Sequence, residues 1–196
     1  MSVVFTEASY ENSIIELFQE MGYTHAYGPD VERDFKSPLY EDLLEDCIRK
    51  VNPGAPNAAI AEALDKLRNF DIGDLVDKNY LFTEYLQNGI ECRYHEKGED
   101  RTALIKLADF KNPENNSFVV TNQWVYPQAH GGKRLDIVLL INGFPVAIGE
   151  MKSPVRPAIS WMDGAGDILS YEKSIPEMFV TNIFNFATEG NWSKND

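Results

Sequence analysis

The sequence has no long hydrophobic run and few cysteines. No stretch of about 18 apolar residues could span a bilayer, and the first residues lack the basic and then apolar layout of a signal peptide. We therefore expect a cytoplasmic protein with no membrane partner. Cys47 and Cys92 lie far apart, without a CxxC spacing or a neighbouring histidine, so neither a zinc site nor a disulfide framework is predicted.

Basic residues are also scarce, with 18 Lys and Arg against 31 Asp and Glu and a formal net charge of -13. Affinity for a nucleic-acid backbone comes from Lys and Arg that displace counterions from phosphates, so this composition argues against a general nucleic-acid coat. If DNA is the substrate, it must be held by a local basic strip or by other domains or subunits. The second alternative predicts weak activity of this chain alone.

The order of hydrophobic patterns predicts one domain of the α/β or α+β class. Helical spacing covers residues 6–21, 37–51, 57–70 and 74–88, which gives a helical part at about 1–89. Strand-like runs and one further helix follow, at 90–96, 101–109, 118–126, 159–173, 178–181 and 184–188. These form a sheet-and-helix part at about 90–190. The last six residues contain no closing element, so we expect a fragment of a longer protein.

Residues 133–154 predict a hairpin of two strongly apolar strands around Asn142 and Gly143. Strands that are apolar on both faces belong to a sheet covered on two sides, where a charge is costly unless it is paired, metal-bound or at a strand end. Asp136 nevertheless begins the first strand, and Glu150 and Lys152 end the second. These three charges at one end of an apolar hairpin require an explanation.

The register of the hairpin decides whether the charges meet. A two-residue turn alone places Asp136 opposite Gly149 and leaves Glu150 on the other face of the sheet. A three-residue turn through Phe144 with a bulge, or a bulge of equal effect, places Asp136 opposite Glu150, with Lys152 on the same face. We predict this second register, because the first excludes a shared metal ion.

The chemistry of these residues suits hydrolysis of a phosphodiester. Asp136 and Glu150 supply hard oxygen ligands for Mg²⁺, and the backbone carbonyl of Met151 can add another. Such a metal polarises a phosphoryl oxygen and acidifies a water for in-line attack. Lys152 can orient or deprotonate that water, or neutralise charge in the transition state. A purely structural ion pair at a strand end is the alternative interpretation of the same spacing.

Two segments carry a resemblance to a known family. Residues 134–154 run Arg-Leu-Asp, an apolar strand, Asn-Gly and Glu-Met-Lys-Ser-Pro, and residues 109–124 lead into an Asn-Gln-Trp strand. Both patterns, with the opening helix, are similar to the PD-(D/E)xK nucleases and, within them, to the N-terminal nuclease domain of the R (restriction) subunit of type I restriction-modification enzymes.

The resemblance implies a restriction-endonuclease-like core, in which helices flank a central mixed sheet, and Mg²⁺-dependent cleavage of double-stranded DNA. It also implies a chain that continues into an ATP-driven motor, with methylation and specificity subunits that choose the DNA site. The motor's Gly-x-x-x-x-Gly-Lys-Ser/Thr loop is absent from these residues, so ATP is expected to bind only the full-length subunit.

Further site residues follow from the resemblance and its departures. Leu135 stands where the family has proline, which is not a ligand. Related nucleases carry Gln-x-x-x-Tyr on the next helix, and here Asp167 and Tyr171 occupy those positions. Asp167 is expected to contact metal or water, or to repel DNA. Glu11 is the candidate for a helix carboxylate that reaches the metal; the alternative is a solvated acid favoured by the helix dipole.

Basic residues near the hairpin are candidate phosphate contacts. Lys133 and Arg134 lie at the expected entrance to the site, with Arg156 on the far side, although ordinary surface charge explains each equally well. Two alternative functions remain open. One is a stand-alone repair or junction-resolving nuclease of the same fold, and the other is a non-catalytic domain that docks DNA or another subunit.

Overall fold

The computed structural model describes residues 6–127, 132–153 and 159–189. Its central element is a mixed five-stranded sheet in the order β1-β4-β5-β6-β7. The strands are β1 (Thr24–Tyr27), β4 (Phe118–Tyr126), β5 (Lys133–Ile141), β6 (Phe144–Lys152) and β7 (Phe184–Glu189). Strands β4, β5 and β6 are antiparallel neighbours, whereas β1 and β7 pair in parallel with β4 and β6 at the two edges.

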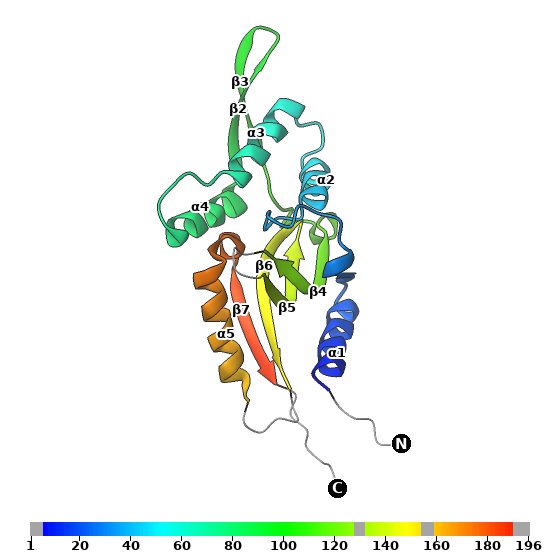
Figure 1. Cartoon of the computed structure of the whole chain (residues 1–196). Coiled ribbons are helices and arrows are strands. Elements are labelled where there is room, and N and C mark those ends of the chain that lie inside the picture. The colour runs from blue at the N-terminus through cyan, green and yellow to red at the C-terminus, as the bar shows by residue number, and fades with distance from the viewer. Residues whose placement is uncertain (1–5, 128–131, 154–158, 190–196) are drawn as a thin grey trace.

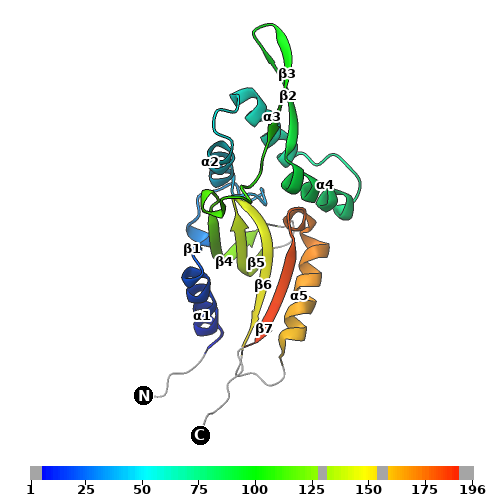
Figure 2. The same ribbon diagram turned by 180° about the vertical axis from the view of Figure 1, so that it is seen from behind.

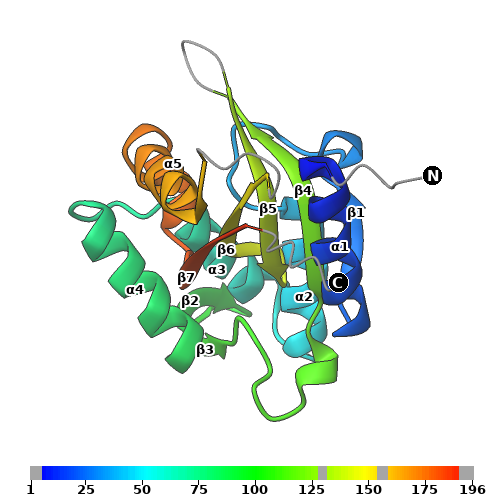
Figure 3. The same ribbon diagram turned by 90° about the horizontal axis from the view of Figure 1, so that it is seen from below.

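One helix covers each face of this sheet, α1 (Glu7–Glu20) on one side and α5 (Trp161–Ser174) on the other (Figures 1 and 3). Ile15 of α1 packs in the same buried cluster as Ile137 and Met151. Ile168 of α5 packs in a second cluster with Ile148. The central strands are therefore buried on both faces, which explains their continuous apolar sequences. This confirms the predicted restriction-endonuclease-like arrangement of a mixed sheet flanked by helices.

A group of helices lies beyond the sheet, at the turn end of the β5–β6 hairpin (Figure 1). It consists of α2 (Glu41–Val51), α3 (Asn57–Arg68) and α4 (Leu75–Asn88), followed by a separate projecting hairpin of β2 (Ile90–Glu96) and β3 (Glu99–Ile105), which is also seen from behind in Figure 2. The rings of Phe82 and Phe144 lie 5.2 Å apart, so the helices pack directly against the hairpin turn. The opposite end of the hairpin, which carries the charges, stays clear of them.

Two local predictions were wrong, and one strand was not predicted. Residues 178–181 belong largely to a 3₁₀ helix, η3 (Pro176–Phe179), and not to a strand. The helix expected from residue 37 begins at Glu41, with Tyr40 as its N-cap residue and the Tyr40 N–H bound to the Gly143 carbonyl of the hairpin turn. Strand β1 was missed, since four residues in parallel pairing at a sheet edge show no alternation of apolar and polar residues. The two remaining short 3₁₀ helices are η1 (Gly28–Asp30) and η2 (Pro113–Asn115).

The hairpin reaches the predicted register through a bulge, which was one of the two predicted routes, and not through a longer turn. Its turn has two residues, with Ile141 paired to Phe144, so the expected three-residue turn was wrong. The register then shifts by one residue, because Leu140 pairs with Pro145 but Leu139 pairs with Ala147. The extra residue is a β-bulge, which restores the alternation that the prediction required. Ile137 consequently pairs with Gly149, and continuing this register by one residue sets Asp136 opposite Glu150.

Gly143 of the turn generates a stability prediction. Its φ is 86°, and a Cβ there would lie 2.7 Å from the Tyr40 carbonyl oxygen and 2.8 Å from the Leu44 nitrogen. Gly54 has a similar φ of 81° with nothing within 4 Å, so it is a matched control. We expect Gly54→Ala to cost about 1–2 kcal/mol from the left-handed backbone alone, and Gly143→Ala to cost about 1–3 kcal/mol more from the steric conflict. Urea unfolding midpoints measure both; equal losses would contradict the docked turn.

Candidate active site

The carboxylates of β5 and β6 meet where the backbone ladder between these strands ends. Asp136 Oδ2 accepts a hydrogen bond of 2.9 Å from the backbone N–H of Met151 on the neighbouring strand. Glu150 is 5% exposed. In the part of the chain that the structure describes, the other oxygen of Asp136 takes no hydrogen bond. The pair therefore forms an acidic centre of one buried and one half-buried carboxylate, in which one Asp136 oxygen is uncommitted.

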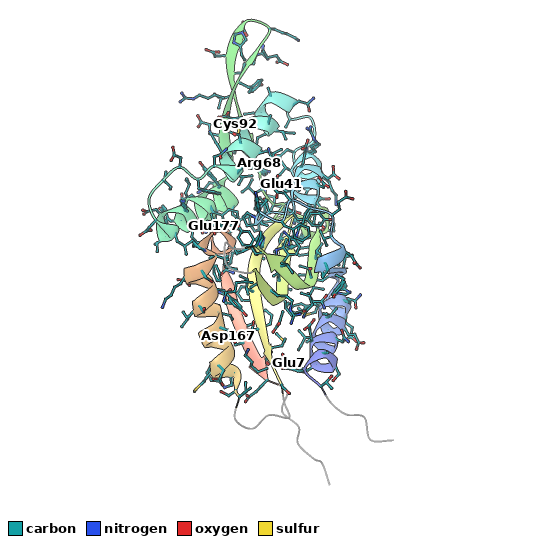
Figure 4. All side chains as sticks on the ribbon, in the orientation of Figure 1. Glu7, Glu41, Arg68, Cys92, Asp167 and Glu177 are labelled. Carbon is teal, nitrogen blue, oxygen red and sulfur yellow. The ribbon has the colours of Figure 1, made fainter. Side chains whose placement is uncertain are left out.

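Lys152 links this centre to α5. Its Nζ donates to Glu150 Oε1 at 2.7 Å and to Asp167 Oδ2 at 2.6 Å. The Tyr171 hydroxyl donates to the other Glu150 oxygen at 3.2 Å. The structure thus brings Glu150, Lys152, Asp167 and Tyr171 together. Asp167 was expected to contact metal or water, or to repel DNA, and its observed partner is Lys152. Figure 4 shows Asp167 on α5 at the same end of the molecule as Glu7 at the start of α1.

A glycine allows α5 to approach the strand this closely. A Cβ on Gly164 would lie 3.2 Å from Ala187 Cβ and 3.3 Å from Glu150 Cγ, closer than most side-chain contacts, and 3.4 Å from Lys152 Cε. A larger residue at this point of the helix would require these neighbouring side chains to shift by a few tenths of an ångström. The small residue at Gly164 is therefore part of the reason why Asp167 and Tyr171 reach the site.

Burial and charge act together on these groups. Burial, and then the nearby charge of Glu150, raise the pKa of Asp136 to about 7. Burial also raises the pKa of Glu150, against the opposing effect of Lys152. Burial lowers the pKa of Lys152, but its hydrogen bonds to Asp167 and Glu150 outweigh this and leave the pKa above its usual value. Tyr171 likewise has a raised pKa, from burial and then from the charge of Glu150. Lys152 therefore stays positively charged, beside two carboxyl groups, Asp136 and Glu150, whose ionisation is disfavoured.

Glu11 of α1 faces the same region and is only 8% exposed. Asn122 Nδ2 donates to its Oε1 at 2.6 Å, and Gln123 Nε2 lies 3.1 Å from Oε1 and 2.8 Å from Oε2. A hollow of about 420 Å³ is lined by Glu11, Asp136 and Arg134 among others. Glu11 is thus buried and hydrogen-bonded, which contradicts the alternative of a solvated acid at the helix start.

The two amides that hold Glu11 were not predicted as site residues. Asn122 and Gln123 were noted only as part of the resemblance, although two successive amides in an apolar strand are a detectable signal. Their shared contact depends on a local backbone distortion, since Gln123 has a φ of 55°. Strand periodicity alone places successive side chains on opposite faces, so it could not have predicted this arrangement.

The basic candidates lie at the edge of the site. Lys133 Nζ is 5.4 Å from the centre of the Tyr171 ring, close enough for a cation–π contact. Arg134 is exposed and lines the hollow beside Asp136. Arg156 lies outside the described residues. Two positive side chains therefore border an otherwise acidic centre.

The arrangement of carboxylates also bears on metal binding. Within residues 6–127, 132–153 and 159–189, no three His, Cys, Asp or Glu side chains are grouped so as to hold a metal ion. Asp136 and Glu150 are the two hard oxygen donors that lie opposite each other. Because Mg²⁺ is commonly held by one or two carboxylates with several waters, these two residues fit such an ion without a third ligand.

Comparison with known proteins decides the family. Residues 4–193 match the family described as "Type I restriction enzyme R protein N terminus". The chain belongs to this family. Membership in the R-protein N-terminal family confirms the resemblance drawn from residues 109–124 and 134–154.

Two relatives show how much of an R protein this region represents. The chain is 30% identical, over 196 residues and 95% of its length, to the type I restriction enzyme HindI endonuclease subunit of Haemophilus influenzae. It is 29% identical, over 178 residues and 86% of its length, to a Methanocaldococcus jannaschii protein provisionally designated the type I restriction enzyme MjaIXP endonuclease subunit. The matches cover 19% and 17% of the lengths of these two relatives.

None of the helices in the described residues has the length and apolar character needed to cross a membrane.

The raised pKa of Asp136 generates a pH prediction. The unfolded chain ionises this carboxyl near pH 3.9, roughly, and the folded chain near pH 7, so ionisation destabilises the fold above pH 7 and the penalty disappears as the pH falls from 7 toward 4. Asp136→Asn carries no such charge. We expect it to be more stable than the wild type by about 1–3 kcal/mol at pH 8 without divalent ions, and by progressively less toward pH 4.

Asp109→Asn is the matched control, measured by the same urea unfolding. Hydrogen bonds from Asn115 and Asn112 lower the pKa of Asp109 to about 2, so both of its transitions lie below pH 4 and it contributes stability throughout the tested range. The Asp109→Asn difference should be destabilising and constant from pH 8 to 5. A pH-independent Asp136→Asn difference would show that Asp136 is not electrostatically disfavoured.

Proposed function

We propose that this chain is the Mg²⁺-dependent nuclease domain of a type I restriction enzyme R subunit and hydrolyses phosphodiester bonds of double-stranded DNA. The observation that carries the proposal is the bulged register of β5 and β6. It sets Asp136 opposite Glu150 and leaves Lys152 hydrogen-bonded to Glu150, at the open end of an apolar hairpin. Charges are placed there at a cost in stability, as is typical of a functional site.

The donor set fits the proposed ion. Asp136 offers an oxygen with no hydrogen bond from the described residues. The N–H and carbonyl of one strand residue point to the same neighbouring strand, so the Met151 carbonyl is directed toward β5, like its N–H. A divalent cation would also offset the repulsion between Asp136 and Glu150. The chemistry that bound Mg²⁺ supplies is polarisation of a phosphoryl oxygen and acidification of an attacking water.

The chain's own residues then have separate roles. Lys152 lies between two carboxylates and holds a positive charge, so it is suited to stabilising negative charge on the reacting phosphoryl group and poorly suited to removing a proton. Tyr171 orients Glu150, and Asp167 orients Lys152. Lys133 and Arg134 bind the DNA backbone at the rim, and Arg156 is a third candidate for this contact.

DNA is delivered by the rest of the assembly in this proposal. The formal charge of -13 gives this chain little attraction for DNA, and it spans about a fifth of its relatives' length. An ATP-driven motor elsewhere in the R subunit, with methylation and specificity subunits, would bring the duplex to the site. ATP is not a ligand of this region.

The test is DNA cleavage by the complete restriction complex, with ATP hydrolysis followed separately. We expect Asp136→Ala and Lys152→Ala each to lower cleavage at least about a hundredfold, because each removes charge stabilisation used in the transition state, and to leave ATP hydrolysis unchanged. Asp100→Ala and Lys97→Ala, on the projecting hairpin, are controls of matched charge and should cleave normally. Full cleavage by both site variants would mean that the nuclease centre lies elsewhere.

The contact between Asp167 and Lys152 gives a second prediction. Asp167 is half-exposed, so we expect Asp167→Ala to raise the activation free energy by only about 1 kcal/mol, because Lys152 is less well positioned. This corresponds to a roughly fivefold lower kcat, with KM for DNA little changed. Asp167→Gln restores the residue of related nucleases and an acceptor oxygen, and should recover most of the activity that Asp167→Ala loses. Asp163→Ala, one turn earlier on α5, is the control for damage to the helix. Equal activity of the Ala and Gln variants would remove the positioning role.

A further inference from the structure

Lys152 has two carboxylate partners, although Glu150 alone would need only one counter-charge. Its Nζ donates to Glu150 Oε1 at 2.7 Å and to Asp167 Oδ2 at 2.6 Å. The Glu150 side chain is 6% exposed, whereas that of Asp167 is 48% exposed. The ammonium group therefore lies between a buried acid on β6 and a more open acid on α5, and the second partner requires an explanation.

Both oxygens of Glu150 are engaged in this arrangement. Oε1 accepts from Lys152, and Oε2 accepts from the Tyr171 hydroxyl at 3.2 Å. The ammonium group carries a full positive charge at hydrogen-bonding distance from the carboxylate, so it repels any cation that approaches the same oxygens. Lys152 therefore competes for Glu150 with the divalent ion that the proposed function requires.

Asp167 gives Lys152 a place to remain when it leaves Glu150. The Nζ atom already contacts both acids, and a lysine side chain is flexible, so loss of the contact with Glu150 needs no movement of the backbone. The Ser160 hydroxyl caps the first turn of α5, and Gly164, one turn before Asp167, lets the helix lie close to Lys152. An ammonium group has three N–H donors, so Lys152 can keep Asp167 and still offer an N–H to a phosphoryl oxygen.

We propose that Lys152 is the internal counter-ion of Glu150 in the ion-free site, and that Asp167 is a positioning residue that retains the ammonium group when a divalent cation binds. The proposal rests on the proposed function, because it assumes that the ion is held by Asp136 and Glu150. It adds a form of regulation, since Lys152 becomes available to a phosphoryl group only once the ion is bound. The competing explanation is that Lys152 is a fixed tie between β6 and α5 that the ion does not disturb.

Binding of Mn²⁺ alone to the 196-residue chain tests this exchange of partners, with free Mn²⁺ measured by electron paramagnetic resonance. Asp167→Asn keeps an oxygen acceptor of similar size but removes the charge, so Lys152 stays on Glu150. We expect this variant to bind Mn²⁺ about tenfold more weakly, a usual effect of losing a residue that supports a metal ligand. Lys152→Met removes the competing cation and should bind Mn²⁺ more tightly than the wild type.

The double variant separates retention of the lysine from simple attraction of the ion. If Asp167 acts through Lys152, adding Asp167→Asn to Lys152→Met should change Mn²⁺ affinity less than about twofold, because the two residues form one coupled pair. If Asp167 acts only through its own charge, the tenfold loss persists in the double variant. Glu172→Gln removes an exposed charge from the same helix and should leave the affinity unchanged.

NMR of the chain with ¹⁵N-labelled lysine gives a second measurement, which does not require Lys152→Met to be stable. The ammonium signal of Lys152 is assigned by its absence from Lys152→Arg, which keeps the positive charge. Saturating Mg²⁺ should shift this signal in the wild type and leave it protected from exchange with water, because Asp167 still holds the group. In Asp167→Asn the same addition should broaden the signal, since a neutral amide oxygen is a weaker acceptor than a carboxylate.

The outcomes separate this proposal from the function on which it rests. A tenfold loss that persists in the double variant, or a Lys152 signal that Mg²⁺ does not shift, would overturn the exchange in favour of a fixed tie. The proposed function would survive either result provided that Asp136→Ala still abolished Mn²⁺ binding. If Asp136→Ala bound Mn²⁺ as the wild type does, the cation site itself would be wrong, and the exchange at Glu150 with it.

Discussion

The cost of burying carboxylates at the end of an apolar hairpin governs this structure. Each acid has its own set of donors: a backbone N–H for Asp136, a lysine and a tyrosine for Glu150, and two amides for Glu11. A buried charge left without such partners would cost several kcal/mol, roughly, which is a large part of a domain's stability. The positions of the flanking helices follow from this requirement as much as from packing.

Helices α1 and α5 contribute residues to these carboxylate contacts from opposite sides of the sheet. Helix α5 approaches β6 at Gly164 and brings Asp167 and Tyr171 to the strand end, whereas α1 brings a carboxylate that strand β4 then holds. The remaining helices pack at the turn end of the hairpin and contribute hydrophobic core. The site is therefore assembled from segments far apart in sequence at the end of the sheet that those helices leave open (Figure 1).

Sequence reasoning succeeded where the physical cause was local. The apolar strands, the charges at their ends and the helices α1 and α4 all follow from short-range patterns. It gave the correct facing of Asp136 and Glu150 but the wrong turn, because a bulge anywhere along β6 satisfies the same alternation. The partner of Asp167 and the left-handed Gln123 depend on contacts between distant elements, so no local pattern encodes them. Strand β1 was missed for the same reason, since its pairing with β4 defines it.

The bulge of β6 also limits how the hairpin can change length in evolution. Because side chains alternate with a period of two, a one-residue deletion between the turn and Glu150 would move the whole remainder of the strand, including Lys152, to the opposite face. Tolerated length changes in this segment must then come as pairs of residues, or as a loss of the bulge balanced by a longer turn. Homologous hairpins of different lengths can therefore keep the same acids facing each other while the irregular residue lies elsewhere.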